Sequence, residues 1–162
     1  DRLKLRVNCE KSSVTRPWYC RFLGFTFTRR GKRRTVSNKA TRQFKDRVRK
    51  ITRRTRGRTI CQVITELGRY LTGWRAYFGF AETRTVFKAL DSWIQRRLRC
   101  YLWKQWGRRG YRELRKRGVS ARLAWNTSKS AHGPWRLSRS PALTFALTTR
   151  AFSKLGLPRL LV

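Results

Sequence analysis

Positive charge is the feature that most constrains this chain, since 42 of its residues are Lys or Arg and only 7 are Asp or Glu. The formal net charge is +35, and a folded domain with that charge repels itself unless a polyanion neutralises it. Arginines outnumber lysines, 31 to 11. Because Arg binds phosphate bidentately and stacks on bases, the composition favours an RNA partner over a merely solvated surface.

The apolar residues are numerous enough to form a core. They make up 40% of the chain, and aromatic residues make up 13%, with seven Trp. This composition is not typical of a disordered chain. No run approaches the roughly 20 apolar residues of a spanning helix, so no membrane partner is expected. The sequence contains no Met and opens in a strand-like pattern, so we interpret it as a fragment or a processed piece, without a signal peptide.

Cysteine and histidine do not predict a metal site in this chain. The four cysteines are Cys9, Cys20, Cys61 and Cys100, and no two form a Cys-x-x-Cys pair. The only histidine is His132, which we expect in a loop. A zinc site needs clustered ligands, so no metal is expected, and the thiols are expected to be reduced rather than paired.

The first 36 residues have a β pattern. Leu3 to Val7 alternate apolar and basic side chains, as in a half-buried strand, and Asn8 to Lys11 supply turn residues. Phe22 to Thr28 is rich in aromatic and β-branched residues and predicts a second strand. Arg30 to Lys32 would turn the chain, and Arg33 to Val36 would return as the partner strand of a hairpin.

From Ser37 the apolar period becomes helical. Ser37 is a plausible N-cap, and the stripes that follow predict helices over 37–51, from near Thr59 to Trp74, from about Thr83 to Trp106, over 111–117, over 121–125 and over 142–149. Residues 126–141 are expected to be irregular. The predicted fold class is therefore α+β: a short antiparallel β-hairpin region over 1–36, followed by a mainly α-helical domain over 37–162.

Several stretches carry a family resemblance. Leu3 to Ser12 resembles the strand and turn that follow the catalytic strand of reverse transcriptase palms, and Phe22 to Phe25 resembles the hairpin that grips the primer end. Gly73 to Phe78 resembles the signature of the maturase thumb, called domain X, and Leu90 to Leu98 and Trp103 to Trp106 follow at the family's spacing. Together they resemble the C-terminal part of a group II intron reverse transcriptase/maturase.

The resemblance implies two domains with different roles, and a set of partners. Residues 1–36 would be the end of the palm, with its primer-grip hairpin, and residues 37–162 the helical thumb/maturase domain that binds RNA. Such proteins bind their intron RNA, assist its splicing and copy it into DNA. The expected partners are structured intron RNA and a template–primer duplex, then DNA and a missing N-terminal polymerase half. The expected location is with nucleic acid in a bacterial cytoplasm or an organelle.

The resemblance also implies a catalytic site that this chain does not contain. The parent would be an RNA-directed DNA polymerase that holds two Mg²⁺ ions on paired aspartates. No two of the seven acids here are adjacent, so we expect that site upstream of residue 1 and no cofactor in this chain. Lys11 would assist as a general acid or charge stabiliser, or would be a solvated turn lysine. Whether the chain takes part in an enzyme is left open.

The candidate contacts for RNA or template–primer combine the hairpin with cations that lie off the apolar stripes. They are Phe22, Leu23, Gly24, Phe25, Arg42, Lys45, Arg49, Arg53, Arg75, Tyr77, Arg96, Arg97 and Lys104. Trp74 is expected in the core, and Tyr77 either in the core or at the surface. The stretch from Trp125 to Trp135 would either stack on RNA bases or pack internally.

Two other functions remain open at this point. The chain could be an Arg-rich structural RNA-binding protein of a ribonucleoprotein, or one half of a split RNA-directed DNA polymerase. Structural proteins of that kind usually carry long unpatterned basic tails. Here the basic residues alternate with regular apolar stripes, which favours a folded RNA-binding domain.

Overall fold

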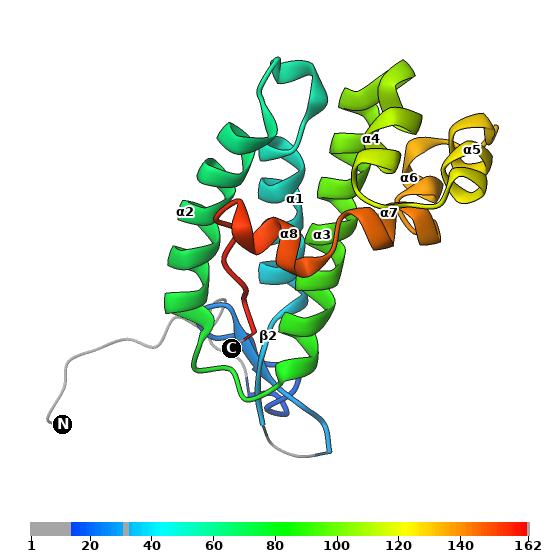
Figure 1. The fold of residues 1–162 in the computed structure, drawn as a ribbon. Helices are drawn as coiled ribbons and strands as arrows, with labels where there is room; N and C mark the ends of the chain where they lie inside the picture. The colour runs from blue at the N-terminus through cyan, green and yellow to red at the C-terminus, as the bar shows by residue number, and fades with distance from the viewer. Residues whose placement is uncertain (1–13, 31–32, 162) are drawn as a thin grey trace, which may run out of the picture.

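The structure is a computed structural model in which residues 14–30 and 33–161 are described (Figure 1). The predicted strand over 3–7, the predicted turn over 8–11 and the candidate Lys11 all lie outside the described residues. The rest of the chain is mainly helical with one small antiparallel hairpin, which confirms the predicted α+β class. Among the described helices, none combines the length and the apolar character that crossing a bilayer requires.

The hairpin is shorter than the sequence predicts. Strand β1 (Phe25–Phe27) pairs antiparallel with β2 (Arg34–Val36), with Thr26 opposite Thr35. The predicted start of the first strand at Phe22 is wrong. Leu23 and Gly24 have positive φ angles of 49° and 82°, so they form a turn, and extended pairing begins only after it.

Gly24 is required at this turn for two reasons. Its φ of 82° lies in the left-handed region that residues with a side chain rarely adopt. A Cβ placed on it would also meet the ring of Phe78 at 3.0 Å. The close approach lets the Gly24 carbonyl accept a hydrogen bond from the backbone N–H of Ser37 at 2.8 Å, which joins the turn to the first helix.

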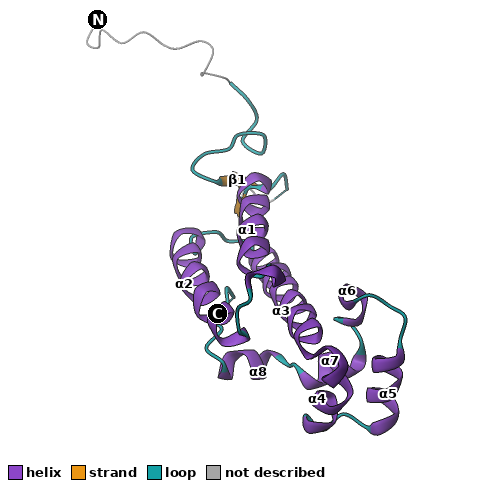
Figure 2. Ribbon diagram, turned by 90° about the horizontal axis from the view of Figure 1, so that it is seen from above, coloured by secondary structure: helices purple, strands orange, loops and turns teal. Residues whose placement is uncertain are grey.

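Three long helices follow and run up, down and up beside one another (Figures 1 and 2). They are α1 (Asn38–Ile51), α2 (Ile60–Phe78) and α3 (Arg84–Trp106). Their ends are set by local chemistry. The Ser37 side chain accepts from the Ala40 N–H, and Thr59 forms a capping box with Gln62. Gly107, with a φ of 49°, ends α3.

Trp74 lies in the middle of the core, as expected, and is only 9% exposed. Its ring centroid is 4.6 Å from that of Phe44 on α1 and 4.5 Å from that of Phe78. Phe87 of α3 meets the same ring edge-on at 5.8 Å. The indole therefore joins all three long helices. Around it lies one continuous buried cluster that includes Val48, Ile51, Ile64, Leu67, Leu71, Leu90, Ile94 and Leu98.

The hairpin packs directly on the helices at one end of the bundle. Phe25 contacts Phe78, with ring centroids 5.2 Å apart. Arg34 joins β2 to the loop between α2 and α3, because its carbonyl accepts from the Glu82 N–H at 2.9 Å and its guanidinium pairs with the Glu82 carboxylate at 3.0 Å. A domain boundary at residue 37 remains a prediction.

Five short helices follow α3. They are α4 (Gly110–Lys116), α5 (Ala121–Lys129), α6 (Pro134–Leu137), α7 (Pro141–Ala146) and α8 (Thr149–Lys154). Two 3₁₀ turns also occur: η1 (Arg54–Arg56) lies between α1 and α2, and η2 (Gly107–Arg109) lies between α3 and α4. In Figures 1 and 2, α4 to α7 gather beside the C-terminal half of α3, and α8 leads back toward α2.

Residues 126–141 are more regular than expected, which corrects the prediction. Helix α5 continues to Lys129, where the hydroxyls of Thr127 and Ser128 bond back to carbonyls one turn earlier. Pro134 then begins α6 at a position where its missing N–H has no cost. The expected tail helix also divides at Leu147, and Thr148 caps the start of α8.

Candidate nucleic-acid interface

Every carboxylate in the described part of the chain is already engaged inside the fold. Asp46 pairs with Arg49, Glu66 with Arg56 and Arg58, Glu82 with Arg34 and Glu113 with Arg117, and Asp91 accepts from the backbone N–H groups of Leu160 and Leu161. These few acids leave most of the cations without a compensating charge. The protein surface therefore carries a strong positive potential.

Three cations surround one indole between α1 and α3. The side chain ends of Lys45, Arg49 and Arg97 lie 5.8, 5.6 and 5.6 Å from the ring centroid of Trp93. We call these four residues the Trp93 cluster. Lys45 and Arg49 are four residues apart on α1, as Trp93 and Arg97 are on α3, so each helix presents its pair on one face.

Arg97 is a partly buried member of this cluster. Its Nε donates to the Thr52 hydroxyl at 2.9 Å, which fixes the guanidinium at the C-terminal end of α1. Burial lowers the pKa of Arg97, and the positive charges of Arg49 and Arg54 lower it further. An arginine nonetheless stays charged at neutral pH. An anion bound here would relieve the repulsion among the three guanidinium groups.

A small hollow of about 220 Å³ continues from the cluster along α3. It is lined by Thr52, Arg54, Arg97, Cys100, Tyr101 and Trp135. Burial raises the pKa of the Cys100 thiol, so this side chain stays neutral at physiological pH. The charged groups of the hollow are therefore the two arginines. Two guanidiniums beside hydroxyl and aromatic side chains make a site of the right chemistry for phosphate.

Arg96 has a different role from its neighbour Arg97. Its guanidinium carbon lies 3.8 Å from the ring centroid of Trp135, and its nitrogens donate to the Trp135 carbonyl at 3.1 Å and to the Ser138 hydroxyl at 3.3 Å. Burial, then the charge of Arg139, lowers the pKa of Arg96. This candidate therefore fastens α6 to α3, and its donors are used within the protein.

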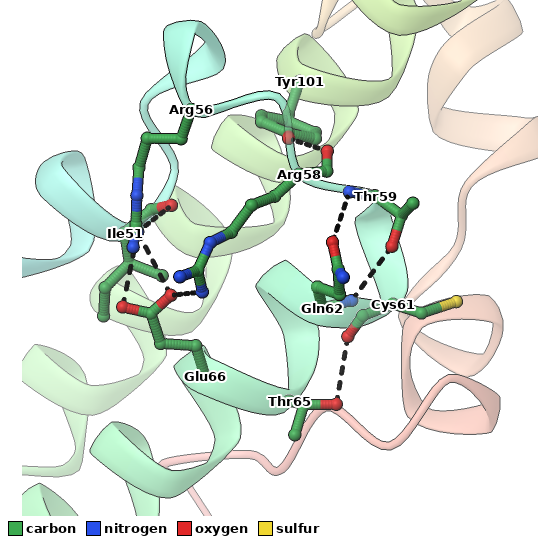
Figure 3. A network of polar contacts seen from close by, with 9 residues as sticks. All are labelled: Ile51, Arg56, Arg58, Thr59, Cys61, Gln62, Thr65, Glu66 and Tyr101. Atoms are coloured by element: carbon green, nitrogen blue, oxygen red, sulfur yellow. Dashed lines mark hydrogen bonds and ion pairs between the residues drawn. The ribbon is translucent and has the colours of Figure 1, made fainter.

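The connection between α1 and α2 is held by a network of polar contacts (Figure 3). The guanidiniums of Arg56 and Arg58 converge on the Glu66 carboxylate at 3.1 and 2.6 Å. Arg56 also donates to the Ile51 carbonyl at 3.3 Å, and the Tyr101 hydroxyl donates to the Arg58 carbonyl. One carboxylate cannot neutralise two guanidiniums, so this ordered loop keeps a net positive charge.

At the opposite end of the bundle, the hairpin exposes apolar side chains. Phe22 and Leu23 are 72% and 65% exposed. Tyr77 stands beside them at the surface, where its hydroxyl donates to the Leu23 carbonyl at 3.0 Å and its ring stacks on Phe25. This settles the alternatives for Tyr77 in favour of the surface. An apolar hollow of about 270 Å³ opens here beside Phe80.

The predicted contact residues are thus distributed over separate places. Lys45, Arg49 and Arg97 meet in the Trp93 cluster, whereas Phe22 to Phe25 and Tyr77 meet at the hairpin end. Arg42, Arg53 and Lys104 are exposed. Arg75 lies elsewhere on α2, where it donates to the Arg159 carbonyl at 3.4 Å.

Sequence reasoning did not name Arg54 or Trp93 as site residues, and it offered Trp135 only as the end of a stretch that would either stack on RNA bases or pack internally. Trp93 falls on the apolar stripe of its helix, and it is partly buried against the core. Its spacing of four residues from Arg97 was the available signal for a second role. Arg54 and Trp135 join the site from distant parts of the chain, and no local pattern indicates that they meet Arg97.

The described residues do not fit a bound metal. No three side chains of His, Cys, Asp or Glu come together within 14–30 and 33–161. The acids there are engaged by arginines or by backbone amides, as described above. The Mg²⁺ site that the resemblance implies for the parent protein has no donor set in this part of the chain.

Residues 41–118 match the family described as "Group II intron, maturase-specific domain". This part of the chain is a group II intron maturase domain. The match begins within α1 and ends just after α4, so it contains the Trp93 cluster, Arg54 and the Glu66 network. The chain therefore contains a maturase domain, which supports a role in the splicing of a group II intron. No curated protein sequence matches the chain.

Proposed function

We propose that this maturase domain binds structured intron RNA through the Trp93 cluster and the hollow beside it. The observation that carries the proposal is the convergence of three cations, from two different helices, on one indole. Such crowding is unfavourable in an isolated protein and becomes favourable when a phosphate enters. Its location inside the matched maturase domain supports intron RNA as the source of that phosphate.

The binding would be by positioning rather than by chemistry on the RNA. Lys45 and Arg49 would contact the backbone of a helical RNA segment, while Arg97 and Arg54 would hold a phosphate in the hollow. The ordered loop that Glu66 holds would extend the positive surface beyond Ile51. Contacts of this kind stabilise a folded intron, and the intron RNA would carry out the splicing reaction.

The hairpin end supports a second candidate function, the gripping of a template–primer. Phe22 and Leu23 are exposed on a turn whose shape Gly24 determines, and Tyr77 supports the turn from α2. A rigid apolar turn of this kind would hold the sugar and base edges of a primer terminus. This activity would require the polymerase half of a reverse transcriptase as a partner.

The test of RNA binding is a comparison of two double variants that remove the same charge. Lys45→Gln with Arg49→Gln removes two members of the Trp93 cluster, and Arg69→Gln with Arg150→Gln removes two exposed arginines from α2 and α8. Arg97 is left intact because it also fastens Thr52. Filter binding to a structured intron RNA would be measured at several salt concentrations.

The wild-type chain should lose about 10³–10⁵-fold in affinity between roughly 50 and 200 mM salt if it neutralises ~6–10 phosphates. The cluster variant should bind more weakly and lower the salt slope by about one unit for each phosphate that it no longer neutralises. The control variant should change both quantities much less. Equal losses from the two variants would mean that binding is spread over the whole basic surface, and the Trp93 cluster would then not be the site.

A further inference from the structure

Helix α5 presents an unusual outer face. Arg122, Trp125, Asn126 and Lys129 follow the spacing of one helical face, and all four are exposed. The opposite face, with Ala124 and Thr127, is buried. Trp125 therefore stands on the polar side of an amphipathic helix, where burial in the core cannot explain it, and its indole is 54% exposed.

The indole of Trp125 is held in a fixed position at the surface. Tyr111 of α4 meets it at an interplanar angle of 88°, with ring centroids 6.1 Å apart. Lys129, one turn along α5, places its ammonium 4.8 Å from the indole centroid. The ring is thus braced by a second aromatic side chain and capped only by the end of a flexible side chain, which an incoming group can displace.

The charge around this face is positive. The one acid of helix α4, Glu113, is paired with Arg117 at 2.6 Å. Arg122 and Lys129 flank Trp125 on its own helix. A face for a protein partner would be expected to carry several apolar side chains in a stripe. A single aromatic ring among arginine, lysine and an amide is instead the composition of a surface that stacks a base and binds its phosphates.

We propose that the outer face of α5 binds unpaired nucleotides of a single-stranded nucleic acid, with one base stacked on Trp125. The Lys129 ammonium would move from the ring to the adjacent phosphate, Arg122 would bind a phosphate on the other side, and the Asn126 amide would lie within reach of a base edge. Trp125 and Lys129 lie outside the matched residues 41–118. The site is separate from the Trp93 cluster and does not depend on it.

The experiment measures binding of a labelled oligouridine and of an RNA duplex of equal length by fluorescence anisotropy. The full chain is used at roughly 200 mM salt, where nonspecific attraction to phosphate is reduced. Trp125→Leu removes the stacking surface, Trp125→Phe keeps an aromatic ring, and Leu155→Ala is a matched control that shortens another exposed apolar side chain. Circular dichroism melts verify folding.

We expect Trp125→Leu to weaken binding of the single strand about 5- to 100-fold and to leave the duplex affinity within about twofold. Trp125→Phe should retain most of the affinity, and Leu155→Ala all of it. If Trp125→Leu does not fold, Lys129→Gln takes its place, because it leaves both rings in position. That variant should weaken single-strand binding and lower its salt slope by about one unit.

Three results would overturn the proposal. The first is an unchanged single-strand affinity in Trp125→Leu, or in Lys129→Gln where that variant replaces it. The second is an equal loss for single strand and duplex, which would indicate a purely electrostatic contact. The third is a loss of self-association in Trp125→Leu without any change in RNA affinity, which would make the face a protein contact. Weaker binding of structured RNA by variants of the Trp93 cluster would test the proposed function above and not this site on α5.

Discussion

Asp91 accepts a hydrogen bond from the backbone N–H of Leu160 at 3.0 Å, across 69 residues of sequence. Its other oxygen accepts from Leu161 at 3.1 Å. The carboxylate is buried, and these two amides are its partners in place of an arginine. Asp91 belongs to the stretch that resembles the family, and its two hydrogen bonds hold the C-terminal segment against α3.

Replacement of Asp91 by Asn should therefore destabilise the protein. The amide oxygen of Asn can accept from one backbone N–H, but its NH₂ group would face the other as a second donor. We expect a loss of about 1–3 kcal/mol in the free energy of unfolding. Urea denaturation would measure it, with Ser92→Ala, at an exposed neighbouring position, as the control. The destabilisation by Asp91→Asn should be smaller in a chain that also lacks residues 159–162, because the partners of the carboxylate are then absent. If the two changes destabilised the protein additively, the contact between Asp91 and the C-terminal segment would be contradicted.

Trp74→Ala should cost about 3–5 kcal/mol of the free energy of unfolding. The substitution empties the space between Phe44, Phe78 and Phe87, which come from all three long helices. A marginal domain would unfold at this cost. Thermal melts followed by circular dichroism would show it. A variant that melts normally but no longer binds RNA would place Trp74 at the interface rather than in the core.

Arg49→Gln combined with Arg53→Gln should leave the fold intact and weaken RNA binding. Arg49 pairs with Asp46 at 2.6 Å, but both side chains are more than half exposed, so the pair contributes little to stability. Loss of two positive charges also eases repulsion within the domain. The melting temperature should stay unchanged or rise, while filter binding shows a lower salt slope. A lowered melting temperature with unchanged RNA affinity would mean that this face of α1 stabilises the fold and does not bind RNA.

Glu113 should give the protein an acid-sensitive component of stability. The hydrogen bond from Arg117 is the main cause of its lowered pKa, and the charges of Arg117, Lys116 and Arg109 act in the same direction. A carboxylate whose pKa is lowered on folding stabilises the protein above the unfolded pKa of about 4.3. That contribution disappears as the pH falls through the folded value.

The Glu113→Gln variant tests this dependence. It should be less stable than wild type at pH 7, and the difference should shrink as the pH falls below 7 and vanish once it lies below the lowered folded pKa of Glu113. Melts in matched buffers over that range would measure the difference. A difference that persists unchanged at low pH would attribute the effect to packing of the side chain rather than to its charge.

The long helices could be predicted because their signals are local. Ser37, Thr59 and Gly107 mark helix ends through contacts with residues only a few positions away, and the apolar stripes between them have a regular period. The strand prediction at Phe22 failed for a tertiary reason. The Phe78 ring lies against Gly24, and the chain turns there although its side chains favour a strand.

The candidate site was harder to predict, because the partners of its side chains are distant in sequence. Arg96 and Arg97 are adjacent and look equivalent, yet one packs on Trp135 of α6 and the other bonds to Thr52 of α1. Charge patterning identifies both as surface cations and cannot show which is engaged within the protein. The same limit applies to Asp91, whose partners lie about 70 residues away.

The return of the chain to the start of α3 affects how this protein can be labelled. Because Asp91 holds Leu160 and Leu161, the last described residues lie against α2 and α3 rather than near the short helices that precede them. In a variant whose native cysteines are replaced by serine, a fluorophore on Arg159→Cys would sense events at the end of the bundle where α3 begins, such as arrival of a primer terminus. One on Lys104→Cys, at the far end of α3, would sense occupancy around the Trp93 cluster. Two such probes would report on the two proposed functions separately in one molecule.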